Sequence, residues 1–184
     1  MLERLLITHC SPTLAGIKTA NLFNYHFTDF KKLEEQLNDM SKTLNGKGVC
    51  VELLRIRKSS ALIFVYRPKK LEIDLKKDGV AGFLAQFGYE QCSVSYCISK
   101  LKLRLAKELD FPHEIGLFLG YPFQDVMGFI ENAGQNCKCV GCWKVYCNEC
   151  EAVKLFARYK KCTDAYSRMF ANGVSMIKLV VAAS

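Results

Sequence analysis

The sequence contains no apolar run long enough to cross a membrane, because no uncharged stretch approaches the ~20 residues that a spanning helix needs. The N-terminal stretch MLERLLITHCSP also lacks the features of a signal peptide, since its apolar part is short and contains Glu3 and Arg4. We therefore expect a cytoplasmic protein that does not associate with membranes. No internal repeat, low-complexity tract or Gly/Ser linker interrupts the chain, so we expect residues 1–184 to form a single domain.

Signatures of several common enzyme classes are missing as well. The sequence has no GxxxxGK[ST] phosphate loop, no GxGxxG dinucleotide fingerprint and no GxSxG nucleophile elbow. Nucleotide hydrolysis, standard dinucleotide binding and serine-hydrolase chemistry are therefore disfavoured. What is present is the composition of a globular protein with a core, since 50% of the residues are hydrophobic and 24% are charged.

Side-chain periodicity predicts an α+β fold, in which a small antiparallel sheet of three to four strands is covered by several helices. Two β-branched runs within residues 49–66 flank a polar turn and predict a hairpin. Alternation predicts another strand near 138–146, and residues 20–27 are a candidate for a further strand. Helices are expected over residues 28–44, 69–87 with a break near Gly79, 94–109, 112–119, 122–132, 149–172 and 175–183.

Ten cysteines are many for a chain of 184 residues. Because no export signal is visible, we expect free thiols, metal ligands or redox groups rather than disulfides. Two CxxC pairs at such spacing can hold zinc or iron, but only four residues separate the pairs, and a strand would place Cys139 and Cys142 on opposite faces. We therefore favour packed thiols, with metal binding as the alternative. The clustered cysteines concerned are Cys137, Cys139, Cys142, Cys147 and Cys150.

Two short blocks supply candidate catalytic residues. In the HCSP block at 9–12, Cys10 is a candidate nucleophile, because a nearby imidazole can lower the pKa of a thiol. In the FPHE block at 111–114, His113 is a candidate base, and Glu114 suits the positive end of a helix that begins after the proline. If Cys10 and His113 act together, their side chains should share a cleft. The alternatives are a packed thiol and a polar histidine at a helix start.

The net charge of +8 is concentrated in two segments. Eight Lys or Arg residues and two acids lie over 55–77, and four bases without an acid lie over 100–107. If the segments adjoin in the fold, they form one positive face that can attract an acidic protein. Nucleic acid is the alternative partner, although no nucleic-acid-binding motif accompanies the bases. The residues assigned to this basic face are Arg55, Arg57, Lys58, Lys69, Lys70, Lys100, Arg104 and Lys107.

The sequence also contains four distinctive blocks: HCSPTLAGIK at 9–18, VYRP at 65–68, FPHEIGLFLGYP at 111–122 and WKVY at 143–146. Together they resemble a bacterial family, known mainly from anaerobes, that is catalogued as domain-of-unknown-function family 3793. The resemblance covers nearly the whole chain and implies a stand-alone single-domain protein, but it implies no particular activity. Family members often lie near flavodoxin or iron-uptake genes, which implies a role in redox or iron metabolism. Within these blocks, the candidate cofactor-binding residues are His9, Lys18, Arg67 and Tyr121.

These observations leave three hypotheses open. We favour a cytoplasmic accessory or binding protein in the redox or iron metabolism of an anaerobic bacterium, which uses a cleft that contains His and Cys. One alternative is a thiol-dependent enzyme with Cys10 as nucleophile and His113 as base. The other is a basic adaptor that binds RNA or an acidic protein such as a flavodoxin. No nucleotide cofactor is expected, because the sequence has no nucleotide motif.

Overall fold

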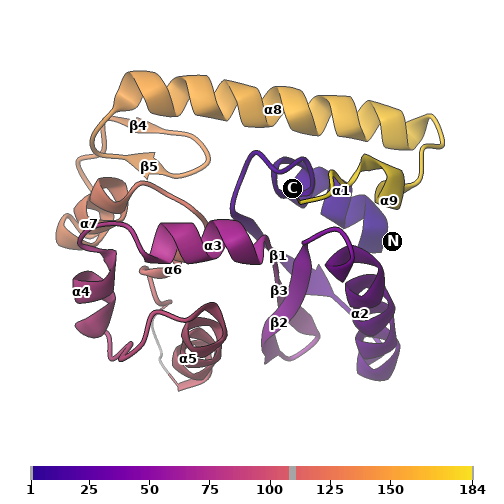
Figure 1. Ribbon diagram of the computed structural model, residues 1–184, viewed down its shortest axis with the longest axis horizontal. Coiled ribbons are helices and arrows are strands. Elements are labelled where there is room, and N and C mark those ends of the chain that lie inside the picture. Colours follow the sequence, from indigo (N-terminus) through magenta and orange to yellow (C-terminus); the bar gives the residue numbers. More distant parts are fainter. Residues whose placement is uncertain (1, 108–110, 184) are drawn as a thin grey trace.

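A three-stranded antiparallel sheet lies at the centre of the computed structural model, which describes residues 2–107 and 111–183 (Figure 1). The strands are β1 (Ala20–His26), β2 (Cys50–Arg57) and β3 (Ser60–Tyr66), and their order in the sheet is β1-β3-β2. The hairpin expected within residues 49–66 and the strand expected over 20–27 are both confirmed. The predicted α+β class, a small antiparallel sheet covered by helices, is confirmed as well.

Helices cover both faces of the sheet, because alternate residues of β3 enter different hydrophobic clusters. Leu62 and Phe64 belong to one cluster, whereas Ile63 and Val65 belong to the other. The first cluster is closed by α3 (Pro68–Leu75), α4 (Val80–Ala85), α5 (Val94–Lys107), α6 (Ile115–Phe118) and α7 (Phe123–Glu131). The second is closed by α1 (Leu2–Leu14), α2 (Phe30–Asn45) and α9 (Met176–Leu179).

The segment expected as one strand over residues 138–146 forms two short paired strands instead. These are β4 (Cys139–Val140) and β5 (Lys144–Val145), with Cys139 opposite Val145. The chain turns at Gly141 and Cys142, and a side chain at Gly141 would overlap the ring of Phe156 on α8 (Glu149–Ala171). The turn therefore packs directly against α8, a long helix that runs over both this hairpin and α1 (Figure 1).

The other helices lie close to their expected positions. Gly79, with φ of 80°, separates α3 from α4, as predicted. The last helix is shorter than expected, and residues 108–109 of the helix expected over 94–109 lie outside the described residues. No helix was predicted at the N-terminus, where α1 buries Leu2, Leu6 and Leu14. None of the helices in the described ranges combines the length and the apolarity needed to span a bilayer.

Candidate functional site

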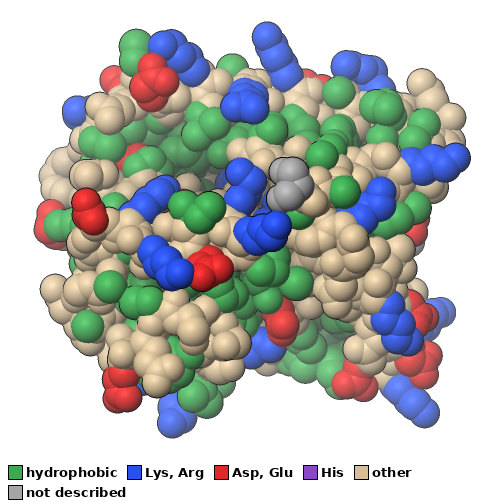
Figure 2. Space-filling view, viewed as in Figure 1, with side chains coloured by type: hydrophobic (Ala, Val, Ile, Leu, Met, Phe, Trp, Pro, Cys, Tyr) green, Lys and Arg blue, Asp and Glu red, His purple; other side chains and the backbone are tan. Residues whose placement is uncertain are grey.

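Three of the predicted cofactor-binding residues line one cavity of about 420 Å³, which we call the lysine cleft. His9 comes from α1, Lys18 from the loop before β1, and Tyr121 from the loop before α7. Cys142, in the β4–β5 turn, lines the same cavity. The α8 side of the cleft is formed by Phe156, Tyr159, Lys160, Thr163 and Asp164. In Figure 2 the surface beneath α8 is recessed and carries hydrophobic side chains.

Lys18 lies at the base of the cleft and is only 5% exposed. Its ammonium group donates to the carbonyl of Ala20 at 2.5 Å and lies 5.3 Å from the centre of the Tyr121 ring. Burial lowers the pKa of Lys18 to about 8, and the thiols of Cys142 and Cys10 oppose this shift. No carboxylate among residues 2–107 and 111–183 forms an ion pair with Lys18. Its positive charge therefore lacks a counter-charge, which an anionic ligand would supply.

His9 and Cys142 are exposed at the edge of the cleft. The imidazole of His9 stacks on Phe23, with ring centroids 5.5 Å apart and an interplanar angle of 14°. Burial raises the pKa of the Cys142 thiol, and the neighbouring Lys18 charge opposes that effect. Tyr121 donates from its hydroxyl to the carbonyl of Cys142 at 3.2 Å, so the hairpin turn and the tyrosine are fixed to each other.

Cys10 lies outside this cleft. It is fully buried between α1 and the sheet, and burial raises the pKa of its thiol. His113 lines a different cavity, between α6, α7 and the β4–β5 hairpin. The structure therefore does not bring Cys10 and His113 into one cleft, and Cys10 has the surroundings of a packed thiol rather than those of a nucleophile.

Glu114, the third candidate catalytic residue, belongs to a buried ion pair. Its carboxylate accepts from Arg104 Nε at 2.5 Å and from the Tyr89 hydroxyl at 3.1 Å. Burial and the nearby Glu114 charge raise the pKa of Tyr89. Since only 1% of the Glu114 side chain is exposed, this network ties α5 to α6 and leaves no room for a substrate at the carboxylate.

Arg67, the fourth predicted cofactor-binding residue, also has a different role in the structure. Its buried guanidinium donates to the carbonyls of Thr13, Leu14 and Val181, each at 2.7 Å. Thr13 and Leu14 form the end of α1, where helix carbonyls have no partner within the helix. Arg67 therefore joins the end of α1 to the C-terminal segment.

The five clustered cysteines do not converge on one point. Cys139 lies in β4 and Cys142 in the following turn, so the expectation that they occupy opposite faces of one strand is not met. The Cys147 thiol donates to Asp125 at 3.1 Å, and Cys150 is exposed in the first turn of α8. Throughout the described part of the chain, no group of three or more His, Cys, Asp or Glu side chains is arranged to hold a metal ion.

Asp125 is the residue near the site that the sequence analysis missed. Its carboxylate is 2% exposed and accepts from Trp143 Nε1 at 2.7 Å and from the backbone N–H groups of Tyr146 and Cys147 at 2.7 and 2.9 Å. Burial opposes ionisation of Asp125, but these hydrogen bonds and that of the Cys147 thiol outweigh it and lower its pKa. Asp125 thus fixes the hairpin that carries Cys142 to the cleft. The sequence signal that could have indicated an acceptor such as Asp125 is Trp143, because a buried indole N–H needs a hydrogen-bond acceptor.

The two basic segments adjoin in the structure, because α5 packs on β2 and Lys102 pairs with Glu52 across them at 2.6 Å. Arg57, Lys58 and Lys107 are exposed, as are Lys69 and Lys70 on α3. Figure 2 shows Lys and Arg side chains gathered over α3.

Other members of the predicted basic face are less exposed. Arg104 points inward to Glu114, with 17% of its side chain exposed. Arg55 lies over the Phe111 ring, with 5.8 Å between the guanidinium carbon and the ring centre, and Lys100 is half-buried.

Comparison with known proteins gives one match. A family model described as a protein of unknown function (DUF3793) matches residues 6–180, a range that includes all four of the distinctive sequence blocks. Neither the search of curated proteins nor the search of solved structures found a match. Because the family model covers well over half of the chain, the protein belongs to the DUF3793 family, the family that its sequence blocks predicted.

Proposed function

We propose that this protein is a small-molecule binding protein and that the lysine cleft holds an anionic group of its ligand. The observation that carries this proposal is the buried ammonium group of Lys18, which lies at the base of the cavity without a described carboxylate to pair with. A buried charge without a partner is costly, so a bound carboxylate or phosphate would be stabilised there.

A second donor group supports the choice of an anion. Asn21 lines the cleft, and its amide oxygen accepts from Thr13 Oγ1 at 2.7 Å. The amide NH₂ of Asn21 is then the group that can donate to a ligand. Tyr121, Tyr159 and Phe156 supply apolar walls for the remainder of the molecule.

We place this binding role in redox or iron metabolism, in the cytoplasm of an anaerobic bacterium. All ten cysteines are free thiols, which is typical of a reducing compartment. The cleft contains a His and a Cys, His9 and Cys142, although the cysteine differs from the one expected. A binding role is preferred to thiol catalysis, since Cys10 and His113 lie in separate surroundings.

The binding proposal can be tested by calorimetric titration with pyrophosphate and malonate, anions without rings, and with putrescine as a cationic control. We expect an anion to bind, putrescine not to bind, and Lys18→Gln to weaken anion binding by at least tenfold, since a charged hydrogen bond contributes about 1.5–3 kcal/mol. Lys160→Gln is the matched control, because Lys160 lines the same cleft but is exposed and pairs with Asp164 at 3.0 Å. Equal affinity in wild type and Lys18→Gln, or no anion binding at all, would refute the proposal.

We further propose that an acidic protein, such as a flavodoxin, docks on the basic face. The exposed positions of Arg57, Lys58 and Lys107 support this, as does the packing of α5 on β2, which brings the two basic segments together. A positive face accelerates encounter with an acidic partner and is screened by salt. Titration with an acidic flavodoxin and with mixed RNA at one ionic strength separates the two partner classes. Binding of RNA without binding of flavodoxin would reverse this choice.

A further inference from the structure

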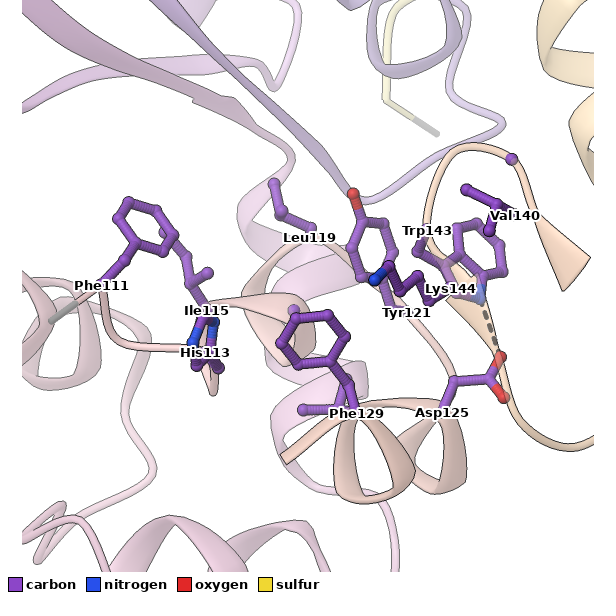
Figure 3. Close-up of a pocket in the computed structure, with 13 residues that line it drawn as sticks. Phe111, His113, Ile115, Leu119, Tyr121, Asp125, Phe129, Val140, Trp143 and Lys144 are labelled. Atoms are coloured by element: carbon purple, nitrogen blue, oxygen red, sulfur yellow. Dashed lines mark hydrogen bonds between the residues drawn. The ribbon is translucent and has the colours of Figure 1, made fainter. Parts of the chain in front are cut away.

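A second cavity, of about 310 Å³, lies between α6, α7 and the β4–β5 hairpin, and we call it the aromatic cavity (Figure 3). Figure 3 shows Phe111 and His113 toward one end, Tyr121 and Trp143 toward the other, and Phe129 between them. Ile115, Leu119 and Val126 complete an almost entirely apolar wall. Ligand sites have this character: volumes from ~300 Å³ upward, aromatic and aliphatic walls, and few polar groups. At the lower end of that range, the cavity suits one or two fused rings.

The walls of the aromatic cavity are fixed by contacts with one another and with α8. Tyr121 stacks on Trp143 with centroids 4.7 Å apart and an interplanar angle of 27°. Trp143 is held in turn by its hydrogen bond to Asp125 and by an edge contact with Phe156, at 4.6 Å and 81°. A side chain at Gly116 would collide with Val126, so α6 and α7 approach as closely as their backbones allow. A preformed cavity binds a ligand without first paying the entropy of ordering its walls.

Three ionisable side chains with different surroundings line the aromatic cavity: His113, Asp125 and Lys144. The carboxylate of Asp125 is occupied by the Trp143 indole and by backbone N–H groups. The His113 ring packs on Phe129, with centroids 4.9 Å apart. The ammonium group of Lys144 donates to the carbonyl of Gly134 at 2.7 Å and lies 5.8 Å from the centre of the Phe129 ring.

Lys144 therefore gives the cavity a positive charge. Its ammonium group has three donors, and only one is used by the Gly134 carbonyl. Within the ranges that the structure describes, no carboxylate forms an ion pair with it. A ligand that brings its own negative charge next to a ring would satisfy both the apolar wall and this cation.

We propose that the aromatic cavity binds a planar aromatic acid, whose ring packs against Phe129 and Tyr121 and whose carboxylate pairs with Lys144. This site is separate from the lysine cleft and does not depend on the function proposed for that cleft. Tyr121 lines both cavities, whereas Lys18 and Lys144 each line one.

The test uses 2-naphthoate as the probe and the indole N–H signal of Trp143 in a ¹H–¹⁵N spectrum as the reporter. The chain has one Trp, so this signal needs no assignment by mutation. We expect the signal to shift saturably with 2-naphthoate, and the neutral 2-naphthalenemethanol to bind at least tenfold more weakly. Lys144→Gln should remove this difference between the acid and the alcohol. Absence of a saturable shift, or equal affinity of Lys144→Gln and wild type for the acid, would overturn the proposal.

A second variant tests the site from the opposite strand, because Val140 pairs with Lys144 in the β4–β5 hairpin. Val140 lines the cavity but is 69% exposed, so Val140→Glu puts a negative charge at the opening with little effect on folding. Val153→Glu, at a 51% exposed valine of α8 outside this cavity, is the matched control. We expect Val140→Glu to weaken 2-naphthoate binding at least tenfold and Val153→Glu and Lys18→Gln to leave it unchanged. Loss of binding in Lys18→Gln would instead assign the probe to the lysine cleft and refute this site.

Discussion

Replacing Asp125 by alanine removes the acceptor on which the β4–β5 hairpin depends. In the native protein its carboxylate accepts from Trp143 Nε1, from two backbone N–H groups and from the Cys147 thiol. Each buried donor left without a partner costs about 1–3 kcal/mol. Tyr146 and Cys147 are half-buried, so water can reach their N–H groups, whereas the indole of Trp143 is 8% exposed. We therefore expect Asp125→Ala to lower the free energy of unfolding by about 3 kcal/mol, a large part of the 5–15 kcal/mol typical of a domain.

The measurement is urea unfolding followed both by circular dichroism and by the fluorescence of Trp143, the only tryptophan. Because the hairpin is attached through Trp143, the emission of the variant should already be red-shifted without urea, before helix content is lost. Asp164→Asn, at an exposed carboxylate paired with Lys160, is the control and should change stability by less than about 1 kcal/mol. If Asp125→Ala and Asp164→Asn unfold at the same urea concentration with unshifted emission, Asp125 does not hold the hairpin.

Three further predictions concern single charges and thiols. Glu114→Gln should lower the free energy of unfolding, measured in urea, by about 1.5–3 kcal/mol, because it removes the charge that faces the partly buried Arg104. Glu52→Gln, at the more exposed pair with Lys102, should lower it by less than about 1 kcal/mol. Equal losses in the two variants would contradict the structural role of Glu114. Under native conditions iodoacetamide should modify the exposed Cys142 and Cys150 and spare the buried Cys10, as measured by peptide mass spectrometry. Early modification of Cys10 would instead support a catalytic role for its thiol. Anion binding in the lysine cleft should weaken up to about tenfold between pH 7 and 9, because the pKa of Lys18 is lowered to about 8 and the amine loses its charge above that pH. Calorimetry at the two pH values measures this change, and equal affinities would contradict a role for the Lys18 charge.

The pH dependence of the Asp125 contribution has the opposite direction. Its pKa is lower in the folded protein than the ~3.9 of an unfolded chain, so the carboxylate stabilises the hairpin above that value. The contribution is lost as the pH falls below ~3.9 through the folded pKa. Acid therefore weakens the hairpin, whereas the lysine cleft loses its charge in alkali.

Local sequence signals predicted most of the fold because they act within a few residues. The β-branched runs around residues 57–60 gave the β2–β3 hairpin, and Gly79 separated two helices as expected. The helix α1 was missed although Leu2, Leu6, Cys10 and Leu14 recur at four-residue spacing. It contains Pro12, a residue that usually ends a helix. Pro12 leaves the carbonyl of Thr8 without its helical donor, and because Thr8 is exposed, water can bind there. The end of α1 is held by Arg67, which binds the carbonyls of Thr13 and Leu14. That contact joins distant parts of the chain, and no local pattern indicates it.

The candidate site was predicted less completely, for the same physical reason. Residue type and block position identified His9, Lys18 and Tyr121, which meet in the lysine cleft. They did not identify Cys142 as the cysteine beside them, because its position depends on a turn that alternation along residues 138–146 did not reveal. Residue type and block position also did not distinguish Arg67 and Glu114, whose charged groups bind partners within the protein, from Lys18, which has no ion-pair partner among the described residues.

The β4–β5 hairpin is the part of the fold on which both proposed sites depend. Its turn contributes Gly141 to the aromatic cavity and Cys142 to the lysine cleft, and Trp143 stacks on Tyr121, which lines both. Of these groups, the Trp143 indole is held by a buried hydrogen bond, which it donates to Asp125. A carboxylate that accepts four hydrogen bonds can hold so short a hairpin, since one pair of two-residue strands contributes few backbone bonds of its own. Loss of Asp125 should therefore reduce 2-naphthoate binding and anion binding together, whereas Lys144→Gln and Lys18→Gln should each reduce one of them.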